Sequence, residues 1–89
     1  MKERDKKMIE AKVFITLKKT VADPQGLTVK HALESLGYKD IGNVRVGKLI
    51  TLEFKDKNKK QLEKEINEMC KKILANPIIE DYTFQLTEA

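Results

Sequence analysis

The alternation of residues 44–54 constrains the fold more than any other feature of the chain. Apolar side chains stand at nearly every second position, and most positions between them are polar. Because successive side chains of a strand point to opposite faces, this pattern predicts a strand with one buried face. Eleven residues of strand would reach roughly 36 Å, well beyond the usual length of about 5–6 residues. Such a strand is too long for one small sheet to cover.

Gly47 and Lys48 interrupt this pattern and indicate two arrangements. Either Gly47 bends the strand, with Lys48 at a bulge or turn, or one end projects and pairs with another chain. The apolar positions keep the same parity on both sides of Gly47. We therefore expect one long, bent strand rather than a hairpin.

A first helix is expected between the opening strand, residues 9–17, and Gly37. Asp23 can cap the helix, and Pro24 fits its first position, where no N–H partner is needed. Gly26 in the first turn costs about 1 kcal/mol against alanine. It indicates either a helix that starts late, which the residues alone favour, or close approach by another backbone or an anion. The expected buried face carries Gln25, Val29, Ala32, Leu33 and Leu36.

A second helix is expected between Asn58, which resembles a capping residue, and the Asn76-Pro77 pair, which stops it. Its expected buried stripe comprises Leu62, Ile66, Met69, Cys70 and Ile73. A third strand follows over residues 81–87. The order strand-helix-strand-helix-strand favours an α+β fold, a two-layer sandwich with both helices on one face of the sheet. The long bent central strand would extend the sheet by dimerisation.

The length of the chain is that of one small domain with a modest core. We expect a charged, disordered leader over residues 1–8 and a single domain over residues 9–89. The balance of 18 basic against 14 acidic residues is compatible with nucleic acid, an anionic substrate or solubility alone. The single Cys70 excludes an intrachain disulfide, and no uncharged apolar run is long enough to cross a membrane. We therefore expect a cytoplasmic protein without a membrane partner.

Catalytic groups are hard to assemble from this sequence. His31 is expected to face outward from the first helix, and one imidazole cannot hold a metal by itself. Cys70 falls on a buried stripe, where a thiol is unreactive. The chain carries no glycine-rich phosphate loop and no paired residues with metal-ligand spacing. The residues alone indicate a small oligomeric α+β domain with no active site and no cofactor of its own.

Three phrases give a more specific indication. The first is Asp23-Pro24-Gln25-Gly26, followed later by Ala32-Leu33 and Leu36-Gly37. The second is residues 44–48 (VRVGK), and the third is residues 70–82 (CKKILANPIIEDY). In this order and spacing the chain resembles the PurS family, the small subunit of phosphoribosylformylglycinamidine (FGAM) synthase. The resemblance covers about Ile9 to Leu86.

The resemblance implies a role in purine biosynthesis within an ATP-dependent ligase. A large synthase subunit binds ATP and formylglycinamide ribonucleotide, and a glutaminase subunit releases ammonia from glutamine. The small subunit joins the two as a dimer or a dimer of dimers and carries no catalytic residue, although the complex uses ATP, Mg and glutamine. Free ammonia is mostly protonated at neutral pH, so the two sites must be docked and water kept out.

The partner interface is expected where residues do not suit the local secondary structure. Gly26 weakens a helix, and Lys48 stands on an apolar parity. Arg45 is the best candidate for a specific contact, because a guanidinium can grip a carboxylate or phosphate with two bonds. The predicted interface residues are Asp23, Pro24, Gln25, Gly26, Arg45, Gly47 and Lys48.

Two other functions remain compatible with the fold. A small regulatory domain that binds a metabolite between dimer halves has the same architecture. A basic nucleic-acid-binding module is less favoured, because the aromatic residues alternate into core positions instead of lining one face.

Overall fold

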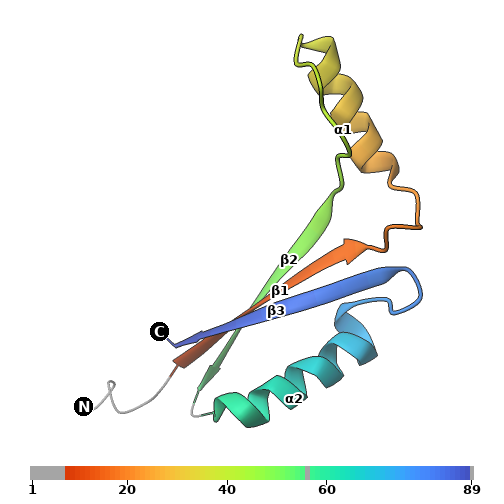
Figure 1. Ribbon diagram of the computed structural model, residues 1–89. Coiled ribbons are helices and arrows are strands. Elements are labelled where there is room, and N and C mark those ends of the chain that lie inside the picture. The colour runs from red at the N-terminus through yellow and green to blue at the C-terminus, as the bar shows by residue number, and fades with distance from the viewer. Residues whose placement is uncertain (1–7, 56, 89) are drawn as a thin grey trace.

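The computed structural model describes residues 8–55 and 57–88 as an α+β domain of three strands and two helices (Figure 1). The predicted fold class and element order are confirmed. A π-helical segment, η2, continues the second helix. The elements are β1 (Met8–Leu17), α1 (Pro24–Ser35), β2 (Gly47–Lys55), α2 (Lys59–Met69), η2 (Cys70–Leu74) and β3 (Glu80–Glu88).

The sheet is antiparallel, with β1 between β2 and β3. The strand predicted over residues 44–54 begins only at Gly47, so its predicted start is wrong. It lies at an edge of the sheet, and the sequence had left the order of the strands open. Its register with β1 is continuous and places Lys48 opposite Ile15, so Lys48 occupies no bulge. Val44 and Val46 continue the apolar alternation because they lie beside the first turns of α1.

The core lies between the sheet and α2, which covers one sheet face (Figure 1). Because β1 has a strand on each side, its alternate residues are fully buried, and Leu62 and Ile66 of α2 pack against them. Asn58 caps α2 as expected, since its side-chain oxygen accepts from the backbone N–H groups of Lys60 at 2.8 Å and Gln61 at 3.4 Å. The β1 residues of the core are Ile9, Ala11, Val13 and Ile15.

The expected buried stripe of the second helix is wrong at Ile73, which is 79% exposed. After Met69 the helix widens into η2, and the N–H of Ala75 donates to the carbonyl oxygen of Cys70. A π-helical turn holds more residues than an α-helical turn, so the inward position after Cys70 passes to Leu74 and Ala75.

The prediction that both helices cover one sheet face is also wrong. α1 projects beyond the end of the sheet (Figure 1), and its expected buried face is largely open, with Val29 42% and Leu36 75% exposed. Three strands spaced about 4.8 Å apart make a sheet about 10 Å wide, which is the width of a single helix. α2 already occupies that width, and the domain extends to 56 Å along its longest axis.

The boundary of the expected leader shifts by one residue. Met8 is the first residue of β1 and pairs with Lys55 of β2. The remainder of that expected segment, residues 1–7, lies outside the described residues. No helix in the described ranges is long and apolar enough to span a membrane.

Candidate functional site

Two chain segments join α1 to the sheet, and together they form what we term the neck. Residues 18–23 lead out of β1, and residues 44–46 return beside the first turns of α1 into β2 (Figure 1). All of the predicted interface residues lie in the neck or directly beside it. The structure therefore brings together the first turn of α1, Arg45 and the start of β2.

Asp23 connects the two segments of the neck. Its Oδ1 accepts from the backbone N–H of Gly26 at 3.0 Å, which is the expected helix cap. Its Oδ2 accepts from the backbone N–H of Val46 at 2.7 Å, which ties the start of α1 to the returning chain. The Val46 N–H, then the Gly26 N–H and the charge of Arg45, lower the pKa of Asp23, although burial acts in the opposite direction. The carboxylate is therefore held ionised as a two-sided bridge.

Gly26 allows the returning chain to touch the helix. A Cβ at this position would lie 2.0 Å from the carbonyl oxygen of Val44, a distance that real Cβ atoms do not adopt. The helix begins at Pro24 and does not start late. The favoured interpretation of Gly26 was therefore wrong, and the close approach of another backbone is the correct alternative.

Arg45 closes the neck from the outside. Its Nη2 donates to the carbonyl oxygens of Lys18 at 2.9 Å and Val21 at 2.8 Å. These bonds join the returning segment to the outgoing one. Arg45 therefore has a structural role within the chain. The sequence could not indicate this role, because every residue carries a backbone carbonyl acceptor.

Gly47 and Lys48 fix the start of β2. A Cβ at Gly47 would lie 2.6 Å from the carbonyl oxygen of Ile15, so the strands approach closely here. The Nζ of Lys48 lies 3.7 Å from Oε2 of Glu80, on the far side of β1. The Lys48 side chain is mostly exposed, so this ion pair adds little stability. Lys48 therefore stands among the alternating apolar positions because the end of the sheet carries a charged pair at this position in place of a core side chain.

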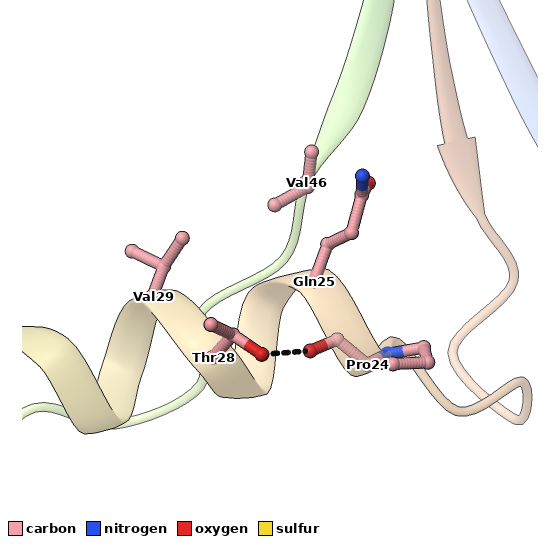
Figure 2. Close-up of a pocket in the computed structure, with 5 residues that line it drawn as sticks. All are labelled: Pro24, Gln25, Thr28, Val29 and Val46. Atoms are coloured by element: carbon pink, nitrogen blue, oxygen red, sulfur yellow. Dashed lines mark hydrogen bonds between the residues drawn. The ribbon is translucent and has the colours of Figure 1, made fainter.

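An open hollow of about 450 Å³ lies beside α1, where Val46 faces the first turns of the helix (Figure 2). The Oγ1 of Thr28 donates to the carbonyl oxygen of Pro24 at 3.0 Å, so its polar group is turned to its own backbone. The hollow is therefore mainly apolar. Its lining residues are Pro24, Gln25, Thr28, Val29 and Val46. Sequence reasoning missed Val29 and Val46 here because it assigned both to the core.

The groups with possible chemistry lie apart from this hollow. His31 is exposed on α1, as expected. Cys70 is fully buried, and burial raises the pKa of its thiol, so the expectation of an unreactive thiol is supported. Within residues 8–55 and 57–88, no cluster of His, Cys, Asp or Glu is arranged to hold a metal ion.

Together these features define a small α+β domain. Its polar side chains at the neck bond within the chain, whereas apolar side chains of α1 are exposed.

Comparisons with known proteins then identify the family. A family model described as PurS, "Phosphoribosylformylglycinamidine (FGAM) synthase", matches residues 10–88. Subunit PurS of FGAM synthase from Bacillus subtilis is 43% identical over 81 residues, covering 91% of this chain and 95% of that protein. The Methanocaldococcus jannaschii subunit is 40% identical, covering 89% and 95%. The chain belongs to the PurS family, and the resemblance seen in three sequence phrases is confirmed.

Solved structures agree with this assignment. Bacillus subtilis PurS superimposes with a TM-score of 0.78 at 42% identity, covering 89% of this chain and 98% of that one. A chain of the structure titled PurLQS from Thermotoga maritima gives a TM-score of 0.81 at 25% identity, covering 90% and 98%. The fold is therefore shared with Bacillus subtilis PurS and with a chain of the Thermotoga maritima PurLQS structure.

Proposed function

We propose that the chain is the PurS subunit of FGAM synthase in purine biosynthesis and that it joins the synthase subunit to the glutaminase subunit. The observation that carries this proposal is the family match over residues 10–88. The similarity to a chain of the Thermotoga maritima PurLQS structure supports an assembly with two other kinds of subunit. The open apolar face of α1 supplies a surface for such an assembly.

The chemistry of the complex explains why a subunit without catalytic groups is needed. Glutamine is hydrolysed at one site, and the ammonia attacks formylglycinamide ribonucleotide activated by ATP and Mg at another. Ammonium is no nucleophile, and free ammonia takes up a proton at neutral pH. An adaptor that docks the two sites keeps ammonia unprotonated and close to its acceptor. This chain would act in the cytoplasm and would use no cofactor of its own.

Self-association is part of the proposal. β2 is an edge strand, and an uncovered edge pairs readily with another chain. Leu49 on β2 and Val29 and Leu36 on α1 expose apolar surface on the isolated chain. We expect a dimer or a dimer of dimers. Analytical ultracentrifugation at micromolar concentration should detect it, and a 10.3 kDa monomer alone would contradict this part of the proposal.

The neck surface around Arg45 and Lys48 is the proposed site of assembly. Arg45→Ala and Lys48→Ala should each give a folded chain that binds the partner subunits more weakly or supports less glutamine-dependent turnover. If Arg45 also meets a buried partner group, its truncation should cost about 2–5 kcal/mol of binding, and a contact at the rim should cost less. Lys64→Ala, on the exposed face of α2, is the matched control.

The decisive experiment mixes the chain with both partner subunits, formylglycinamide ribonucleotide, ATP, Mg and glutamine. The wild-type chain should copurify with both subunits and raise glutamine-dependent turnover. Failure of the wild-type chain to bind either subunit would overturn the proposed function. Wild-type behaviour of both Arg45→Ala and Lys48→Ala would overturn only the assignment of the neck surface.

A further inference from the structure

The attachment of α1 differs from that of α2. α2 is held by a buried apolar face, whereas Gly26 is the only buried residue of α1 within the described chain. Val44 of the returning chain is half-buried and lies beside Gly26 and Leu27, so α1 and that segment form a small unit of their own. No other described strand or helix packs extensively against α1. The position of this unit relative to the sheet must therefore come from the neck.

Three hydrogen bonds cross the neck. The N–H of Val46 donates to Oδ2 of Asp23, and Nη2 of Arg45 donates to the carbonyl oxygens of Lys18 and Val21. Hydrogen bonds weaken steeply with distance and angle, so they restrict direction more tightly than apolar contact does. The contact between Gly26 and the Val44 carbonyl prevents the two segments from closing further.

We propose that this hydrogen-bonded neck, and not apolar packing, fixes the direction in which α1 leaves the sheet. Asp23 and Arg45 are then positioning residues for the docking of α1 in FGAM synthase. The first statement concerns the isolated chain, and the second rests on the proposed function.

A small rotation of α1 at the neck produces a large displacement of its far end. A helix of the length of α1 spans about 18 Å, so a swing of about 10° at the neck moves the far end by roughly 3 Å. The far end carries Leu36, which is exposed and available to a partner. A displacement of this size exceeds what a packed interface accepts without rearrangement.

Asp23→Asn separates the two roles of Asp23. Asparagine caps helices as well as aspartate does, so the bond to the Gly26 N–H can remain. Its side chain has one oxygen, and its amide nitrogen is a donor that cannot accept from the Val46 N–H. The substitution therefore removes the bridge and leaves the cap. Asp40→Asn is the matched control, because Asp40 is exposed and has a φ of 63°, which asparagine also adopts readily.

The test measures the distance between α1 and the sheet. Spin labels at His31→Cys and Lys12→Cys, both exposed, in a Cys70→Ser background report it by pulsed electron resonance. Unlabelled chain is added in excess to suppress distances between protomers. His31 lies about 10 Å along α1 from the neck, so a swing of about 10° moves it by roughly 2 Å. Asp23→Asn should shift the distribution by about 2 Å or broaden it at least twofold, while the helix content by circular dichroism stays unchanged. Asp40→Asn should match the wild type.

A distribution for Asp23→Asn that matches the wild type and Asp40→Asn would overturn the proposal. The functional part is tested by titrating each variant into the two partner subunits. Asp23→Asn should raise the concentration for half-maximal glutamine-dependent turnover several-fold, and a loosened neck with unchanged titration would overturn the positioning role. Failure of the wild-type chain to bind the partners would instead refute the proposed function, and the distance measurement would stand.

Discussion

For Gly26→Ala, the structure and simple helix propensity predict opposite changes in the free energy of unfolding. In an exposed helix, replacing glycine by alanine stabilises the protein by about 1 kcal/mol. At position 26 the added Cβ would lie 2.0 Å from the carbonyl oxygen of Val44 and 2.9 Å from its carbonyl carbon. We therefore expect this alanine to destabilise the protein.

The magnitude follows from how far the neck must open. Ordinary van der Waals contact begins near 3.4 Å, so the Val44 backbone must retreat by more than 1 Å. A retreat of about 1 Å would carry the neighbouring Val46 N–H out of hydrogen-bond range of Asp23. Overpacking of this kind costs about 1–3 kcal/mol, and a backbone atom cannot swing aside as a side-chain tip does. The clash is with backbone, so we place the cost in the upper part of this range, at about 2–3 kcal/mol. Subtracting the gain in helix propensity of about 1 kcal/mol leaves an expected net loss of about 1–2 kcal/mol.

Urea denaturation followed by circular dichroism measures the free energy of unfolding. It should be run at one protomer concentration, because self-association would link stability to concentration. Gly42→Ala is the control with the same chemical change, since no atom lies within 4 Å of its added Cβ. It should stabilise by about 0.4–1 kcal/mol. Were Gly26→Ala to stabilise the chain as Gly42→Ala does, the close approach of Val44 would place no constraint on the fold.

Three further predictions concern the core and the neck. Ile66→Ala should lower the free energy of unfolding in the same urea assay by about 2–5 kcal/mol, because Ile66 is fully buried; a loss below about 1 kcal/mol would contradict its place in the core. Cys70 should react with a thiol reagent at the rate of a free thiol only after denaturation, because burial shields it and raises its pKa; rapid labelling of the native chain would show an open site. The pKa of Asp23 is lowered in the folded chain, so its contribution to stability is complete above its unfolded pKa of about 3.9 and is lost as the pH falls through the lower folded value. The stabilities of wild type and Asp23→Asn should thus converge below about pH 4, and a constant difference between them would argue against the bridge.

Local signals in the sequence predicted the elements well. Asp23 and Asn58 bond to the first turns of their helices, and Gly37 has a φ of 100° at the end of α1. Each of these roles depends on a residue and its immediate neighbours. The alternation of β1 was equally clear, because it is buried on one face along its whole length.

The order of the strands could not be predicted from alternation. A period of two reports one buried face and is the same for a strand with one neighbour as for a strand with two. β1 and residues 44–54 therefore show the same alternation, although only β1 lies between two strands of the sheet. The helical period of α1 likewise does not predict which element, if any, covers its apolar face. Ile73 was misplaced because the π-helical turn at η2 changes the period inside a continuous helix.

The candidate site was predicted in part, through residues that break local rules. Gly26 and Lys48 drew attention to the neck, and the structure gives each a physical reason. The bridge from Asp23 to Val46 could not be predicted, because its donor is a backbone N–H that every residue except proline carries. Whether the seven predicted residues contact a partner stays a prediction.

The central place of β1 has a consequence for how the chain folds. Leu17 pairs with Glu80 and Ile9 with Glu88, so one edge of β1 is completed only by residues far along the chain. Pairings of such long sequence separation close large loops and form slowly. Until β3 arrives, a strand with an apolar face stands with an open edge, which is the form most prone to aggregate. The rate at which β3 docks therefore sets how long each new chain is vulnerable.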